Sequence, residues 1–288
     1  MIKKIKYFLE FIIIINLFLI FKLIGLKYSS YFSGKLGIFF GPVFRPKKLI
    51  VNNILRASPH LKTRDIKKIT KSMWNNYGKI LGEFLFMKKF RDASLDSYIQ
   101  IEGSEILEEI KKTNETVIFV SGHFNNFELM AMQIDKIGIN VAAIYRPLNN
   151  IFINIIMEKI RKKYICQNQI QKGIRSIRKL LTMFKNGYSI ALMIDQRVSE
   201  GAKVNFFGQM AYTTTIPAQF AKKFNCRIVP IYIERLNNDV HFKMKIHEPL
   251  SFDKEDSIEK ITLRLNEWLE KAILKNKDQW IWTHNRWK

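Results

Sequence analysis

The stretch TVIFVSGHFNNFELMAMQIDKIG, residues 116–138, decides the predicted fold. Its first half is an apolar run rich in β-branched residues, which is typical of a strand buried on both faces of a sheet. Its second half reads as a helix, and residues 140–147 then return to a strand pattern. A strand, a helix and a second strand in succession indicate a parallel β-α-β unit.

The same alternation runs through most of the chain. Further strands are predicted at 98–103, 188–196, 203–208, 227–235 and 240–249, and helices at 63–88, 104–112, 150–163, 172–186, 214–225 and 255–275. Ser104 is predicted to cap its helix, and Gly187 to follow the end of another. The pattern predicts an α/β fold with a mostly parallel central sheet flanked by helices.

An apolar segment precedes this domain. Three lysines stand before an apolar stretch from Tyr7 to Leu26, which is about the length that crosses a bilayer. No small-x-small cleavage site follows it, so we expect residues 1–30 to be an uncleaved membrane anchor that spans the bilayer or lies in its interface. Residues 31–288 form the main domain, and the basic residues that begin it favour a cytoplasmic location.

The formal charge of +23 implies an anionic partner, although lysine-rich codon usage also contributes to it. Nucleic acid, an anionic membrane surface, a phosphorylated lipid or an acidic protein would each fit this charge. The apolar segment favours the membrane and argues against nucleic acid. The two cysteines, Cys166 and Cys226, lie in no ligand-like cluster, so no disulfide framework and no metal site are predicted.

His123 and Glu128 are the candidate catalytic pair. His123 directly follows the strand pattern, at the carboxyl end of a central strand where open α/β sheets place their sites. Spacing alone proves little, because His60 and Asp65 repeat it at the start of a helix, where a structural role is sufficient. A hydrogen-bonded histidine at a strand end remains the alternative for His123.

Residues 122–128, GHFNNFE, resemble the first block of the glycerolipid acyltransferase superfamily, and specifically of the lipid A secondary acyltransferases, which carry Gly-His-Phe-Gly-Asn-Trp-Glu. This sequence departs from that block at Asn125 and Phe127. Segments similar to the family follow one another in order at 52–66, 73–84, 144–150, 173–196, 204–208, 228–235 and 279–288. The resemblance therefore covers nearly the whole chain.

The resemblance implies direct transfer of a fatty acyl chain from an acyl-carrier-protein thioester to a hydroxyl of a phosphorylated disaccharide lipid, at the bacterial inner membrane. His123 would be the general base, because an imidazole can take up a proton near neutral pH, and Glu128 would hold the ring. Arg146 would bind phosphate or the oxyanion, unless it is a plain surface residue. The acceptor-binding residues implied by the resemblance are Asp195, Gln196, Phe207 and Gly208, although Asp195 could instead order the loop that follows its strand. No cofactor and no metal are implied.

Several alternatives stay open at this stage. Lys172, Arg175, Arg178 and Lys179 could receive an acidic carrier protein, or could form a solvated helix face. The acceptor could be a lysophospholipid or a mannosylated inositol lipid, and a non-catalytic lipid-binding protein would share the same groove. A phospholipase is disfavoured because no Gly-x-Ser-x-Gly elbow occurs.

Overall fold

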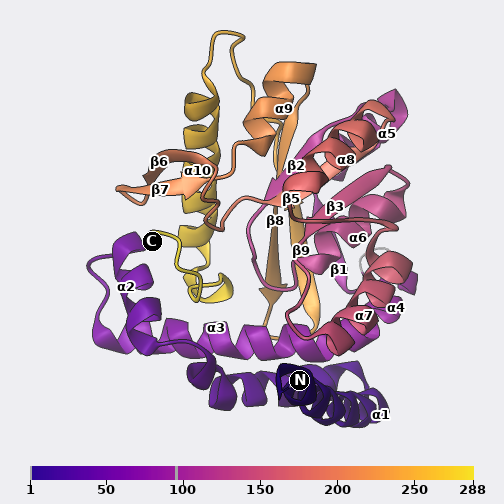
Figure 1. Ribbon diagram of the computed structural model, residues 1–288, viewed down its shortest axis with the longest axis vertical. Helices are drawn as coiled ribbons and strands as arrows, with labels where there is room; N and C mark the ends of the chain where they lie inside the picture. The colour runs from indigo at the N-terminus through magenta and orange to yellow at the C-terminus, as the bar shows by residue number, and fades with distance from the viewer. Residues whose placement is uncertain (1, 95–96) are drawn as a thin grey trace.

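A seven-stranded sheet forms the centre of the computed structural model (Figure 1). The structure describes residues 2–94 and 97–288, apart from the side chains of Ile2, Ile174 and Arg175. The strand order is β1 (Ile99–Glu102), β9 (His241–Ile246), β8 (Ile228–Leu236), β2 (Ile118–Ser121), β5 (Ser189–Met193), β3 (Val141–Tyr145) and β4 (Asn168–Gln171). Neighbours are parallel except β8 and β9. The predicted α/β fold with a mostly parallel sheet is confirmed.

The helices cover both faces of the sheet. Helix α6 (Glu128–Ile137) leads from β2 outward to β3, whereas α8 (Ile174–Lys185) leads from β4 back to β5. Because such crossovers are right-handed, connections that run in opposite directions along a sheet lie on opposite faces. The remaining helices of these layers are α5 (Ser104–Thr113), α7 (Ile151–Ile160), α9 (Ile216–Phe224) and α10 (Ile258–Lys275).

The amino-terminal helices form a layer of their own. Helix α1 (Ile2–Phe44) is broken at Gly25, whose φ of 81° only glycine adopts readily, so two arms meet there. Figure 1 shows α3 (Thr63–Glu83) crossing beneath one edge of the sheet, with α1 below it. Helix α2 (Lys47–Ala57) links the two. The predicted domain boundary at residue 30 falls inside the second arm of α1.

Several local expectations differ from the structure. Gly103, in the left-handed region, occupies the N-cap position of α5, and Ser104 is already the first helical residue, so the predicted cap at Ser104 is wrong. Gly187 does follow α8, with a φ of 83°. The helix predicted at 63–88 ends at Glu83 and continues as a 3-10 turn (Phe84–Phe86) and α4 (Met87–Asp92).

The elements not predicted include α2, β4 and β7 (Gln209–Thr213). Strand β6 (Ala202–Phe206), which was predicted, pairs with β7 in a separate antiparallel hairpin outside the central sheet. Strand β4 has three polar residues among its four, and β7 begins with two exposed residues, Gln209 and Met210, so neither has the pattern of a buried strand.

Candidate active site

The topology brings His123 and Asp195 together at the carboxyl edge of the sheet. Strands β2 and β5 are parallel neighbours in which Ser121 pairs with Met193. His123 and Asp195 each lie two positions beyond that pair, so they face one another. His123 Nδ1 lies 2.7 Å from Asp195 Oδ1. The second carboxylate oxygen accepts the His123 backbone N–H at 2.7 Å and the Trp280 indole N–H at 2.9 Å.

The surroundings of Asp195 keep its carboxylate ionised. Its side chain is 1% exposed, and burial alone would raise its pKa, but the contacts from His123 and Trp280 outweigh burial and hold the pKa of Asp195 below its usual range. An ionised carboxylate can only accept a hydrogen bond, so a neutral ring must carry its hydrogen on Nδ1, facing Asp195. Nε2 is then free to accept a proton, and Gln196 Nε2 lies 3.5 Å from it.

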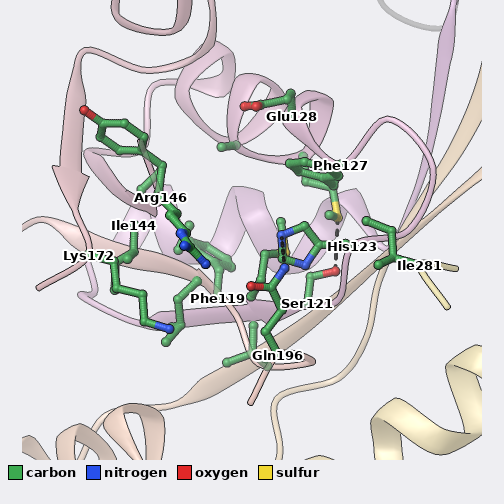
Figure 2. A pocket seen from close by; sticks show the side chains of 18 of the residues that line it. Phe119, Ser121, His123, Phe127, Glu128, Ile144, Arg146, Lys172, Gln196 and Ile281 are labelled. Carbon is green, nitrogen blue, oxygen red and sulfur yellow. Dashed lines mark hydrogen bonds between the residues drawn. The ribbon is translucent and has the colours of Figure 1, made fainter. Parts of the chain in front are cut away.

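The predicted contact between Glu128 and the His123 ring is wrong. Glu128 is the first residue of α6, and its Oε1 accepts a hydrogen bond from Arg161 Nε at 2.8 Å and another from Nη2. The ring beside His123 is that of Phe127, with centroids 4.8 Å apart and planes at 72°. In Figure 2 the Glu128 carboxylate lies beyond Phe127 as seen from His123. The acid that holds the imidazole is therefore Asp195.

Arg161 is a residue of this site that the sequence did not reveal. It begins a π-helical turn (Arg161–Ile165) after α7, is 8% exposed, and packs over the Tyr145 ring at 5.4 Å. Among the described residues, its Nη1 has no hydrogen-bond partner. A buried guanidinium group with free donors is costly unless an oxygen reaches it. Arg161 therefore offers a binding point for an oxygen atom of a ligand.

A cavity of about 410 Å³ joins these groups. His123, Glu128, Arg161 and Gln196 all line it, and much of the remaining lining is apolar, including Phe119, Met130, Ile134, Ala143, Ile144, Ala191, Leu192 and Ile281. Figure 2 labels Phe119, Ile144 and Ile281 of this apolar lining around the same pocket as His123 and Gln196. The combination of a base and an apolar chamber fits a reaction on a lipid.

Three exposed cations, Arg45, Arg146 and Lys172, also line the cavity. Within the described part of the chain, none of them has a carboxylate within 4.0 Å. Burial, followed by the charge of Arg146, lowers the pKa of Lys172. Arg146 thus lines the same cavity as His123, at the end of β3, and these three cations form an outer rim suited to an anionic group.

Phe207 and Gly208 are not brought to this cavity. They form the turn between β6 and β7 and line a separate depression with Arg56 of α2. Phe207 has a φ of 52°, and its ring packs against Phe206 and Trp287. The structure does not bring them together with Asp195 and Gln196, because the hairpin carries them away from the carboxyl ends of the central strands, and their role in acceptor binding stays a prediction.

The two departures from the family block have physical explanations. Asn125 has a φ of 45°, in the left-handed region that glycine and asparagine tolerate best, so it substitutes for glycine. Its side-chain oxygen accepts a hydrogen bond from Arg235 Nε at 3.0 Å, which glycine could not do. Phe127 retains the aromatic face against His123.

Other candidates have structural roles. Ser121 Oγ donates to the Ile231 carbonyl at 2.6 Å, and burial raises the pKa of Cys166 to about 12, so neither is an activated nucleophile. His284 lines the cavity, but burial lowers its pKa to about 4 and its Nε2 accepts the Arg197 N–H. His60 lies exposed in a turn. Among the residues described, no cluster of three or more His, Cys, Asp or Glu could hold a metal ion.

Comparison with known proteins connects this geometry to a family. The family described as bacterial lipid A biosynthesis acyltransferase matches residues 1–288. The chain is 22% identical over 260 residues to the lipid A biosynthesis lauroyltransferase of Escherichia coli (strain K12), covering 88% of this chain and 82% of that protein. It is 23% identical over 185 residues to the lipid A biosynthesis myristoyltransferase of the same organism, covering 63% and 56%.

Proposed function

Because the chain belongs to the bacterial lipid A biosynthesis acyltransferase family, we propose that it transfers a fatty acyl chain from an acyl-carrier-protein thioester to a hydroxyl group of a lipid A precursor. The observation that carries this proposal is the His123–Asp195 pair at the entrance of an apolar cavity. An alcohol is a poor nucleophile when neutral, so its acylation needs a base in this position.

His123 acts as that base. Its Nε2 accepts the proton of the acceptor hydroxyl as the oxygen attacks the thioester carbonyl carbon. The tetrahedral intermediate then collapses, the carbon–sulfur bond breaks, and the imidazolium returns the proton to the leaving thiolate. Asp195 keeps the ring in the tautomer with Nδ1–H and stabilises the imidazolium that forms. The product is an ester, and no residue of the chain is acylated.

Glu128 acts through Arg161. The ion pair between them is 10% exposed on each side and orients the guanidinium group over Tyr145. The free Nη1 donors can then meet the carbonyl oxygen of the donor, or the oxyanion that develops from it. Glu128 is thus a positioning residue and Arg161 is the group that touches the substrate.

The charges around the cavity support an anionic acceptor. Arg45, Arg146 and Lys172 form the outer rim, where a phosphate of a lipid A precursor would meet them before its hydroxyl reaches His123. Arg178 and Lys179 are exposed on α8, and they are suited to the acidic surface of a carrier protein. The side chain of Arg175, which was grouped with them, lies outside the described residues.

The function is tested by mass spectrometry of lipid A from cells that lack the gene, complemented with wild type, His123→Ala or His60→Ala. We expect wild type and His60→Ala to restore one secondary acyl chain, and His123→Ala to fail. His60 is the matched control because it has the same five-residue spacing to an acid yet lies exposed in a turn. An unchanged lipid A profile in the deletion strain, with no redundant paralogue, would reject the acceptor.

We propose that α1 seats the enzyme on the membrane, with the main domain on the cytoplasmic side. It contains a stretch long and apolar enough to cross a bilayer, of which only 17% is buried in the protein. Leu23, Phe39 and Val43 are each at least 75% exposed, on both arms of the helix. Yet the first arm also contacts the main domain, because the Glu10 carboxylate accepts a hydrogen bond from Asn150 Nδ2 at 3.0 Å. These contacts favour an arm that lies along the membrane surface.

Flotation with vesicles of phosphatidylethanolamine and phosphatidylglycerol tests the seating of α1. The triple change Leu23→Ser, Phe39→Ser and Val43→Ser should release the protein from the vesicles. Met210→Ser is the control, because Met210 is 54% exposed on β7, far along the chain from α1. Equal flotation of the triple variant and the control would reject α1 as the docking surface.

A further inference from the structure

Two alanines in the middle of the sheet are only partly buried. Ala143 on β3 and Ala191 on β5 belong to strands that have neighbours on both sides, and α6 covers the same face. Residues in such positions are normally fully buried. Both alanines instead line the cavity that holds His123, so the cavity reaches inward between the sheet and the helices.

The strand register defines the inner end of this cavity. Ala191 pairs with Phe119 on one side and with Ala143 on the other, and Ala143 pairs with Gln169. These four residues form one row across β2, β5, β3 and β4, and all four line the cavity. Only the two central members are small. The row therefore has a notch at its centre, between Phe119 and Gln169.

The cavity ends just beyond this row. The residues two positions earlier on β2, β5 and β3 are Val117, Ser189 and Val141. Each is at most 1% exposed, and none of them lines the cavity. Ile134 of α6 and Ile165 cover the row from the helical side. His123 follows the other end of β2, so the row lies about 13 Å along the strand direction from the base, four residues at roughly 3.3 Å each.

We propose that this notch, formed by Ala143 and Ala191, holds the far end of the acyl chain that is transferred and sets its length. The inference rests on the proposed function and deepens it. A chain whose carbonyl carbon lies at His123 can extend only inward, because the outer rim is cationic and the inner walls are apolar. The acceptor carries its own acyl chains on a large polar headgroup, so it approaches from the rim and delivers only its hydroxyl.

The test is a competition assay with purified full-length enzyme, one lipid A precursor, and an equimolar mixture of saturated acyl-carrier-protein thioesters of different even chain lengths. Ala191→Leu and Ala143→Leu each add three carbon atoms to the notch. For each variant we compare transfer of the chain that the wild type prefers with transfer of a chain two carbons shorter. We expect this ratio to fall by about 10-fold, since each buried methylene contributes about 0.8 kcal/mol. Phe119→Leu, which widens the row, should shift preference toward longer chains.

Ala202→Leu is the matched control, because Ala202 is a partly exposed strand alanine on β6 that does not line the cavity. It should leave the chain-length profile of the wild type unchanged. Unaltered profiles in all three notch variants would overturn the assignment, as would a changed KM for the acceptor without a changed donor preference. If Ala143→Leu and Ala191→Leu do not fold, the chain-length profile of Phe119→Leu decides the question. Failure of the wild type to acylate any lipid A precursor would instead reject the proposed function.

Discussion

Replacing Asp195 with asparagine should nearly abolish acyl transfer while leaving the fold intact. The Asp195 Oδ2 atom accepts both the His123 backbone N–H and the Trp280 indole N–H, so the amide oxygen of the substituted side chain would keep that position. The amide nitrogen then faces His123 Nδ1, where the carboxylate Oδ1 lay at 2.7 Å. Because an amide nitrogen donates, Nδ1 must accept, and the ring hydrogen moves to Nε2.

The size of the loss follows from that change of tautomer. With a hydrogen on Nε2, His123 cannot take the proton of the acceptor hydroxyl, and general-base catalysis is worth about 10²- to 10⁴-fold. We therefore expect kcat/KM to fall by about that factor, which corresponds to about 3–5 kcal/mol of transition-state stabilisation. Since the two hydrogen bonds to Oδ2 persist and the third is only reversed, while the charge of the pair is lost, the free energy of unfolding should fall by only about 1–3 kcal/mol.

Two measurements decide this prediction: steady-state acyl transfer with a defined thioester, and the ¹⁵N shifts of the imidazoles in a protein with five histidines. Asp195→Asn should move the ring hydrogen of His123 from Nδ1 to Nε2, and Glu128→Gln should leave it on Nδ1. A variant Asp195→Asn that keeps more than a tenth of wild-type kcat/KM would refute the reasoning. So would a tautomer change in Glu128→Gln, because that carboxylate would then be the one that holds the ring.

Three further predictions follow from contacts around the site. A double-mutant cycle with Glu128→Gln and Arg161→Lys, measured on kcat/KM, should give a coupling energy of about 1–3 kcal/mol, and additive effects would contradict the positioning role. Asn125→Ala should destabilise the protein in urea by about 1–2 kcal/mol more than Asn125→Gly, since only alanine is strained at a φ of 45°. Burial, followed by the charge of Arg235, lowers the pKa of Lys79 to about 8. The wild type should therefore gain stability relative to Lys79→Met as the pH rises above 8, and a difference in unfolding free energy that does not change with pH would contradict this.

The fold was largely predictable because its strands are buried. The apolar run before His123 marks β2, and the alternation of such runs with helices leaves few topologies to consider. Strand β4 was missed because its residues, Asn168–Gln171, are mostly polar and lie at the edge of the sheet. The break at Gly25 was missed because a glycine inside a long apolar run also fits a continuous helix.

The site was predictable in part. Both His123 and Asp195 were expected at the carboxyl ends of strands, and that much follows from the sequence. Their contact depends on β5 being the neighbour of β2, although β3 and β4 come between them in the chain. The five-residue spacing to Glu128 instead suggested a local partner, and no sequence pattern pointed to Arg161, which lies 33 residues further on. Contacts between non-consecutive elements are what a one-dimensional pattern omits.

The charges of the cavity are arranged in an order that fits the proposed reaction. Close to the base, each acid is paired with a basic group: Asp195 with the His123 ring, and Glu128 with Arg161. Beyond them the inner lining is apolar, and the cations without a carboxylate partner in the described residues, such as Arg146, stand at the outer rim. A free charge deep in the cavity would oppose entry of an alkyl chain, because its desolvation costs several kcal/mol. At the rim, the same charge would remain hydrated and attract the phosphorylated lipid of the proposed reaction, so that the two proposed substrates would meet at His123 from opposite sides.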